Sequence, residues 1–193
     1  MSEQRTAPQR LRVTGLQEAQ LPTLKRIDEA CAAMYHAIGF DAAEVPARST
    51  ADIAALTKEH NVHVAEADDE TAGYVAWRDE PPGVAYIEEL NVDPELQRFG
   101  IGSRLVEAVA EDALSHGITH AVVRCWTKAR WAADFYAQAG FVPFGDAAPE
   151  EVAGWKELRA GSGRALTRPG EVLLWIELRQ PARDPDPTDP DLA

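Results

Sequence analysis

A glycine-containing turn joins an expected strand to an expected helix near the middle of the chain. The segment from Val92 to Leu105 reads VDPELQRFGIGSRL. Gly100 and Gly102 permit close approach of a ligand to the backbone, and the first-turn amides of a helix that begins near Ile101 are unpaired donors. The positive end of the helix dipole adds to their attraction for anions. The segment therefore predicts a site for phosphate oxygens.

Two well-known glycine loops differ from this one. A Walker loop requires Gly-Lys-Ser or Gly-Lys-Thr after its first glycine and a short spacer, and a Rossmann fingerprint requires a third glycine. That third glycine would fall at position 105, where this chain has leucine. Neither of these nucleotide-binding loops is therefore predicted.

Three motifs stand in the order and approximate spacing of the GNAT N-acetyltransferase superfamily. The hexapeptide QRFGIG at 97–102 matches its Gln/Arg-x-x-Gly-x-Gly/Ala signature. A Leu-x-Val-x-Pro motif precedes it at 90–94, and FYAQAGF follows it at 135–141. The order of expected elements from 11 to 178 is similar as well. The chain thus resembles this superfamily over nearly its whole length, apart from its ends.

The resemblance implies acetyl-CoA as co-substrate, with no metal ion. The pantetheine would pair like an added strand with backbone groups around Leu90 to Val92, and the pyrophosphate would lie on the amides of Phe99 to Ser103. Arg98 either contacts a phosphate or is a solvated surface arginine. Ala129 departs from the family, which often has an asparagine there. The candidate cofactor-binding residues are Leu90, Asn91, Val92, Gln97, Arg98, Phe99, Gly100, Ile101, Gly102 and Ser103.

Acyl transfer to an amine needs a base, hydrogen-bond donors for the developing oxyanion, and an acid for the leaving thiolate. Family members with a base on the 84–92 strand place it at positions aligning with Tyr86 or Glu88, so Glu88 is the candidate base, acting directly or through a water. A salt-bridged carboxylate is the alternative. Strand alternation puts Tyr86, Glu88, Leu90 and Val92 on one face. Glu89 is the reserve, because a bulge would reverse the alternation.

Tyr136 is the candidate acid. It aligns with the tyrosine that protonates the departing CoA sulfur in this family, and a backbone amide near Val92 is the expected oxyanion donor. Cys125 could instead form an acyl-enzyme, but no histidine is near it in sequence and its strand context indicates a packed thiol. Direct attack in a ternary complex is therefore the expected route.

Alternating and helical periodicities predict the elements that position these residues. We expect a single α/β (α+β) domain, with a mixed, mostly antiparallel sheet of about seven strands flanked by about four helices. Residues 10–180 form this domain, after a flexible N-terminus (1–9) and before a disordered acidic Pro/Asp tail (181–193). Helices are expected at 21–38, from Ser49 or Thr50 to about 60, at 101–115 and at 129–140. Strands are expected at 11–16, 62–67, 71–77, 84–92, 121–126, 141–144 and 171–178. The segment 146–170 either covers the acceptor site or is a surface excursion.

Composition narrows the classes of partner. Thirty-two Asp and Glu against 19 Lys and Arg give a formal net charge of −13, which argues against nucleic-acid binding. Cys31 and Cys125 have no partner at the spacing of a disulfide framework or a zinc site. No apolar run is long enough for a membrane span, so we expect a cytoplasmic protein. The last strand, with Trp175, is a candidate seam for a homodimer.

The sequence thus predicts an enzyme that moves an acetyl group from acetyl-CoA to a primary amine of a small metabolite. Another acyl group, such as succinyl or propionyl, is an alternative, because the glycine loop contacts only CoA phosphates. The acceptor could also be a protein lysine or N-terminus. A non-catalytic acyl-CoA-binding module is the alternative from another class, and it would not need Glu88 or Tyr136.

Overall fold

The computed structural model describes residues 7–145, 148–162 and 165–180. The predictions for residues 1–6 and for the 181–193 tail fall outside the described residues. Between these limits the elements follow the expected order, with one additional helix.

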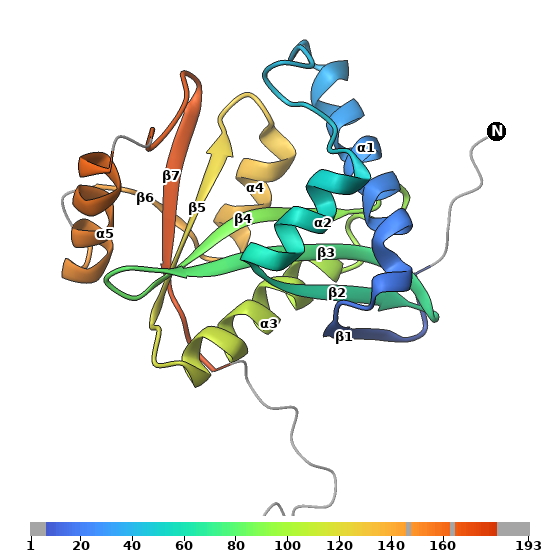
Figure 1. Ribbon diagram of the computed structural model, residues 1–193, viewed down its shortest axis with the longest axis horizontal. Coiled ribbons are helices and arrows are strands. Elements are labelled where there is room, and N and C mark those ends of the chain that lie inside the picture. Colours follow the sequence, from blue (N-terminus) through green and yellow to red (C-terminus); the bar gives the residue numbers. More distant parts are fainter. Residues whose placement is uncertain (1–6, 146–147, 163–164, 181–193) are drawn as a thin grey trace, which may run out of the picture.

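A seven-stranded sheet in the order β1-β2-β3-β4-β5-β7-β6 forms the centre of the molecule (Figure 1). Neighbouring strands are antiparallel except β4 and β5, which are parallel. This mostly antiparallel sheet with flanking helices confirms the predicted fold class. The strands are β1 (Leu11–Gly15), β2 (Asn61–Ala67), β3 (Glu70–Glu80), β4 (Val84–Val92), β5 (His120–Trp126), β6 (Val142–Pro143) and β7 (Glu171–Glu177).

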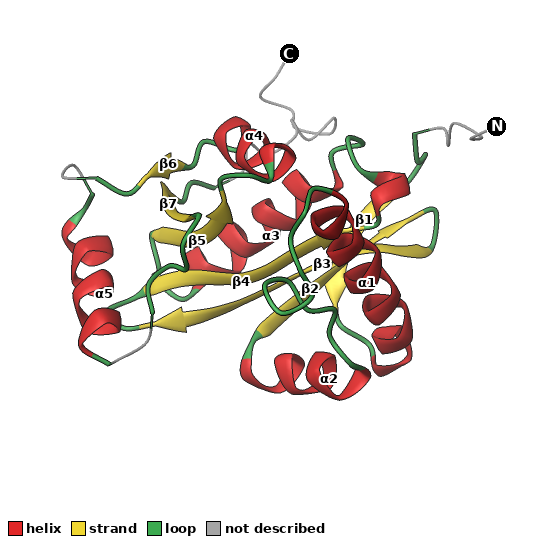
Figure 2. Cartoon of the chain, turned by 90° about the horizontal axis from the view of Figure 1, so that it is seen from above, coloured by secondary structure: helices red, strands yellow, loops and turns green. Residues whose placement is uncertain are grey.

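Helices cover both faces of the sheet, with α3 and α4 on one side and α1 and α2 on the other (Figure 2). Ser49 caps α2 as predicted, because its hydroxyl accepts a hydrogen bond from the Asp52 amide at 3.2 Å. Two short 3-10 turns, η1 (Glu18–Gln20) and η2 (Pro94–Leu96), precede α1 and α3. The helices are α1 (Leu21–Ala37), α2 (Thr50–Glu59), α3 (Ile101–Ser115), α4 (Arg130–Gln138) and α5 (Glu150–Gly161).

The helix α5 was not predicted, and it adds one to the approximately four helices expected from the sequence. It carries Glu150 and Glu151 in its first turn, where carboxylates stabilise the helix dipole. Val152 and Trp155 are its buried residues. Gly154 lowers the helix propensity between them and masks the pattern in the sequence. Part of the 146–170 segment is thus a packed helix.

The apolar core lies in three clusters, one for each set of helices. The largest lies between the sheet and α3, and it includes Trp77, Ile87 and Leu105. A second lies beneath α1 and α2, around Tyr74. The third joins β4 and β5 to α5, where Trp155 stacks on Tyr86 with ring centroids 5.7 Å apart. Strand β4 contributes to the first and third clusters, and it therefore links the helices on opposite faces.

Candidate active site

Strands β4 and β5 separate part-way along their length. Their pairing covers Ala85–Ile87 of β4 and Ala121–Val123 of β5. Beyond this pairing, β4 continues to Val92 and β5 to Trp126, but the two strands no longer pair with each other. We call this opening the fork. One edge of β4 after Ile87 therefore has backbone groups with no neighbouring strand.

A β-bulge marks the point where β4 enters the fork. Ala76 of β3 pairs with Glu89, and the next residue, Trp77, pairs with Ile87. Glu88 therefore has no partner in β3, and the side-chain alternation of β4 shifts at this residue.

The bulge overturns one sequence prediction. Leu90 and Val92 pack in the cluster beside α3, whereas Tyr86 packs against α5 on the opposite face. The prediction that Tyr86, Glu88, Leu90 and Val92 share one face is therefore wrong. Asn91 lies on the α1 side of the sheet, because its Nδ2 donates to the Tyr74 hydroxyl at 3.0 Å.

The predicted phosphate loop, residues 97–103, lies beside the end of β4. The Gln97 side-chain amide donates to the Val92 carbonyl at 3.2 Å. Gly100 precedes α3 with φ of +80°, a conformation that glycine adopts without strain. A Cβ atom on Gly102 would lie 3.0 Å from the Phe135 ring, so glycine permits the N-terminus of α3 to pack against α4. The first-turn amides of α3 have no partner within the helix. The loop, α4 and the open end of β4 thus converge.

Tyr136 lies in the main core with 7% of its surface exposed. Its ring makes an edge contact with Phe141 at a centroid distance of 5.3 Å. Burial raises the pKa of the Tyr136 hydroxyl well above its usual value, and the Glu89 carboxylate acts in the same direction. The phenol is therefore protonated at neutral pH and remains a proton donor.

Glu89 belongs to a polar cluster between β4 and α1. Arg48, in the loop after α1, bonds Glu89 through Nη2 and the buried Asp28 through Nη1, the latter at 3.2 Å. Asn91 Nδ2 lies 3.4 Å from Glu89 Oε2. Burial raises the pKa of Glu89, although the charge of Arg48 opposes this effect. The sequence reasoning missed Arg48 and Asp28, because only the tertiary fold brings them to Glu89.

Glu88 faces two arginines, and His60 lies near it. Its carboxylate oxygens lie 3.3 Å from Arg124 Nη2, 3.4 Å from Arg78 Nη2 and 3.9 Å from His60 Nε2. The side chain is 19% exposed. The ion-paired alternative considered for Glu88 thus describes its surroundings, and its role as a base stays a prediction.

One protein family matches the part of the chain that contains the fork, the glycine loop and Tyr136. The sequence profile of the Acetyltransferase (GNAT) family matches residues 21–141. The chain belongs to the GNAT acetyltransferase family. It is accordingly an N-acetyltransferase, as the motifs predicted. A comparison with curated proteins finds no match.

Solved acetyltransferases share this fold at low sequence identity, which by itself shows only the fold. The ribosomal-protein-S18-alanine N-acetyltransferase from Escherichia coli is 14% identical, with a TM-score of 0.60 over 91% of this chain and 98% of that chain. A PaiA N-acetyltransferase from Thermoplasma acidophilum, in complex with coenzyme A, is 13% identical, with a TM-score of 0.65 over 87% and 99%. N-acetylglutamate synthase from Neisseria gonorrhoeae, complexed with coenzyme A and N-acetyl-glutamate, is 20% identical, with a TM-score of 0.61 over 88% and 35%.

Cys125 of this acetyltransferase has the surroundings of a packed thiol. It is 3% exposed, and burial raises the pKa of the thiol to about 11. Very little reactive thiolate exists at neutral pH under these conditions. These surroundings favour the expected direct transfer of the acetyl group over a route through an acyl-enzyme on Cys125.

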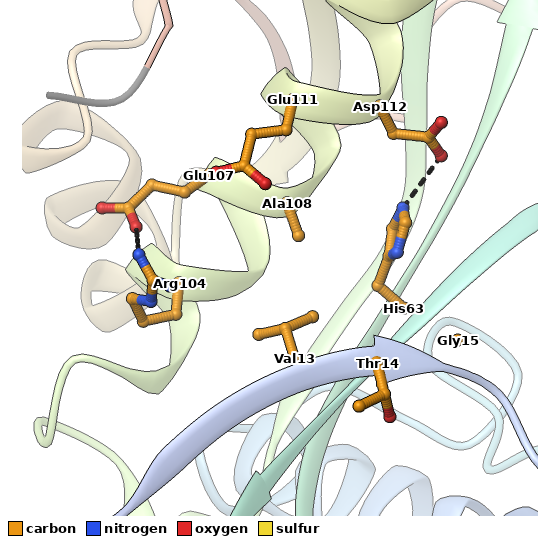
Figure 3. A pocket seen from close by; sticks show the side chains of 9 residues that line it. All are labelled: Val13, Thr14, Gly15, His63, Arg104, Glu107, Ala108, Glu111 and Asp112. Atoms are coloured by element: carbon orange, nitrogen blue, oxygen red, sulfur yellow. Dashed lines mark hydrogen bonds and ion pairs between the residues drawn. The ribbon is translucent and has the colours of Figure 1, made fainter. Parts of the chain in front are cut away.

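Two surface cavities lie outside the predicted site. One of about 420 Å³ opens between β1 and α3, where His63 Nε2 lies 3.0 Å from Asp112 Oδ2 (Figure 3). The other, of about 540 Å³, runs along α3 and β7. Neither is lined by a predicted catalytic or cofactor-binding residue. The fork, rather than either of these cavities, therefore locates the candidate site.

In the part of the chain that the structure describes, no helix combines the length and apolarity that a membrane crossing requires. The same residues form no group of three or more His, Cys, Asp and Glu side chains arranged to hold a metal ion.

Proposed function

We propose that this enzyme transfers an acetyl group from acetyl-CoA to the primary amine of a small molecule, by direct attack in a ternary complex. The observation that carries the proposal is the fork between β4 and β5, which opens beside the glycine loop and near Tyr136. An opening of this kind offers an unpaired strand edge, anion-binding amides and a proton donor at one place.

The residues around the fork fit acetyl-CoA. The free edge of β4 at Leu90 to Val92 offers main-chain groups to the amides of a pantetheine arm. The exposed Gly100 has no neighbouring atom within 4 Å of a built Cβ, so an anion can approach the amides of Phe99 to Ser103. When bound, acetyl-CoA supplies an acetyl group activated as a thioester. The whole set of predicted cofactor-binding residues stays part of this proposal.

We assign the role of base to Glu89 in preference to Glu88. Burial favours the neutral form of Glu89 and so increases its affinity for a proton, as a base working near neutral pH requires. The charge of Glu89 also acts on the Tyr136 hydroxyl. Glu88 instead lies among Arg78, Arg124 and His60, and its carboxylate is engaged by the two arginines. Glu88 is then a positioning residue that holds Arg124.

Tyr136 is the proposed acid, and it gives its hydroxyl proton to the departing sulfur. Its position supports this role, because its ring contacts Phe135, which packs against Gly102 of the glycine loop. A backbone amide near Val92 is the proposed hydrogen-bond donor to the developing oxyanion, because the free edge of β4 lies within the fork.

The loop between α1 and α2 supports a small acceptor. Three contacts hold this loop in place. Phe40 packs on Trp126 of β5 at a centroid distance of 4.8 Å, and Lys128 Nζ, in the turn after β5, lies 3.4 Å from the Gly39 carbonyl. Arg168, in the segment before β7, donates to the Glu44 carbonyl at 2.9 Å. A loop fastened in this way covers the end of β5 and leaves little room for an extended protein segment. Arg168, from the segment 146–170, thus helps to cover the acceptor side.

The direct test is thiol release from acetyl-CoA with a panel of amino acids, polyamines, amino sugars, aminoglycosides and a lysine peptide, with the product checked by mass spectrometry. We expect turnover of a small amine, and little turnover of the peptide. Acetyl-CoA binding without turnover of any acceptor would instead indicate a binding module. Faster turnover of the peptide would indicate a protein acetyltransferase.

A further inference from the structure

Tyr86 lies at the centre of a group of arginines on the sheet face opposite α3. The guanidinium carbons of Arg159, Arg78 and Arg124 lie 4.4, 5.3 and 5.9 Å from its ring centroid. Tyr86 itself has no exposed surface. We call these four residues the Tyr86 cluster. In a chain with a formal net charge of −13, they bring three positive charges to one ring.

The cluster contains most of the unsatisfied buried polar atoms of the described chain. Four buried side-chain atoms have no hydrogen-bond partner there, and three of them are Tyr86 Oη, Arg124 Nε and Arg159 Nε. A buried donor without a partner costs about 1–3 kcal/mol, so such atoms are rare and tend to mark sites that a ligand or water completes. The two guanidinium nitrogens can only donate, so the partner that they lack is an acceptor of hydrogen bonds.

The arginines of the cluster differ in how firmly carboxylates hold them. Glu80 accepts bonds from Arg159 at 2.7 Å and from Arg78 at 2.6 Å, with Trp155 Nε1 at 2.6 Å. Arg124 lies farther from its carboxylate partners, with Glu88 at 3.3 Å and Glu171 at 3.9 Å. Its side chain is 22% exposed. Arg124 is thus the arginine of the cluster that carboxylates hold least closely.

Arg124 also lies where it can contact the acceptor substrate. It directly follows Val123, the last residue of β5 that pairs with β4, so it stands where the fork begins. It lies on the face of Tyr86 and Glu88, away from α3. Because the proposed acetyl-CoA site uses the N-terminus of α3, the acceptor must reach the fork from the face of Arg124.

We propose that the acceptor amine carries a carboxylate, as an amino acid or another amino carboxylate does, and that Arg124 binds this carboxylate. The inference rests on the proposed acetyl transfer and names the substrate class of the same site. The planar guanidinium offers two parallel donors that match the two oxygens of a carboxylate. The amine of such an acceptor then lies at the fork, within reach of the base on β4.

Matched acceptors test this inference. The twenty proteinogenic amino acids and a series of ω-amino carboxylates are each compared with their carboxamides in the thiol-release assay. We expect kcat/KM to be at least about tenfold higher for the acids than for the amides, as the loss of a charged hydrogen-bonded pair implies. Arg124→Gln should bring the ratio close to one by raising KM for the acid, with KM for acetyl-CoA unchanged. Arg124→Lys should keep part of the preference.

Arg12→Gln is the matched control, because Arg12 pairs with Glu66 at the far edge of the sheet and should not affect the preference. Thermal unfolding verifies that each variant is folded. If Arg124→Gln does not fold, Arg124→Lys replaces it in the test. Equal turnover of acids and amides, a preference that survives in folded Arg124 variants, or acetyl-CoA binding without acetylation of any acid would overturn the inference. Loss of acetyl-CoA binding and of all turnover in the native enzyme would instead overturn the proposed function itself.

Discussion

The two halves of β4 lie in different surroundings. From Ala85 to Ile87 the strand is paired with both β3 and β5, and these side chains are at most 1% exposed. From Glu89 to Val92 it is paired with β3 alone. The side chains of Glu88, which has no partner in β3, and Glu89 are 19% and 21% exposed. The change from the closed half to the open half occurs at the bulge on Glu88.

This difference shows how one strand serves both the core and the site. The closed half is fixed by ladders on both sides and by the Tyr86–Trp155 stack. The open half continues from it as a rigid extension with a free edge. Changes in the open half should therefore affect catalysis, and changes near the closed half should affect stability.

The largest effect is expected from Tyr136→Phe, which removes the proposed acid at the fork. General acid catalysis contributes about 10²–10⁴-fold, and we expect kcat to fall about a thousandfold. The ring contact with Phe141 is kept, so the free energy of unfolding and the KM for acetyl-CoA should change little. Steady-state thiol release and thermal unfolding measure these quantities. A variant that keeps nearly the native kcat would remove Tyr136 from the mechanism.

Glu89→Gln should lower kcat/KM about a hundredfold, since it removes the proposed base. The base acts when deprotonated, so native kcat/KM should rise with pH through the raised pKa of Glu89. This acidic limb should disappear in Glu89→Gln. Glu88→Gln is the matched variant one residue away, and it should keep the limb. A limb that disappears in Glu88→Gln instead would return the role of base to Glu88.

Near the closed half, Glu80→Gln should reduce stability by about 2 kcal/mol, because Arg159 and Trp155 would lose a charged partner. Glu80 pairs with Val84 at the start of β4. Denaturant unfolding at neutral pH measures the loss, and kcat of the folded variant should stay close to native. A kcat that falls as far as in Glu89→Gln would contradict the division between the two halves.

The same carboxylate gives a prediction for pH. Burial opposes the ionisation of Glu80, but the bonds from Arg159, Trp155 and Arg78 outweigh it and hold its pKa below the usual value. Its stabilising contribution is therefore complete above the unfolded pKa of about 4.3 and is lost as pH falls through the lower folded pKa. Glu80→Gln should show a weaker decrease of unfolding free energy in this acidic range.

The smallest effect is expected from Gly100→Ala, compared with Gly117→Ala at the other end of α3. Both glycines have φ near +80°, and neither has an atom within 4 Å of a built Cβ. Each variant should lose about 1 kcal/mol of stability through the left-handed conformation alone. Isothermal titration should show weaker acetyl-CoA binding for Gly100→Ala only. Equal affinities in the two variants would argue against the phosphate site.

Local signals were sufficient to predict most of the elements. The two-residue period of 84–92 and the capping Ser49 identified β4 and the start of α2. A bulge on this strand was considered only as an alternative, because its presence at Glu88 depends on how β3 aligns with β4. The helix α5 was hidden by Gly154, although Val152 and Trp155 stand at helical spacing.

The polar surroundings of the site were beyond sequence reasoning for the same reason. Arg48 and Glu89 are 41 residues apart, and Arg124 and Glu88 are 36 apart. Motifs identified the glycine loop and Tyr136 because their function depends on local spacing. Which cations each carboxylate meets depends instead on contacts between distant segments.

The central claim, that acetyl-CoA binds at the open half of β4, is tested most directly by amide hydrogen exchange with and without acetyl-CoA. Slower exchange is predicted for amides of Leu90 to Val92 and of Phe99 to Ser103. Amides of Val84 to Ile87, already paired in the sheet, should exchange at unchanged rates. Protection confined to the cavity between β1 and α3, or to the edge along β7, with none at the fork, would contradict the account.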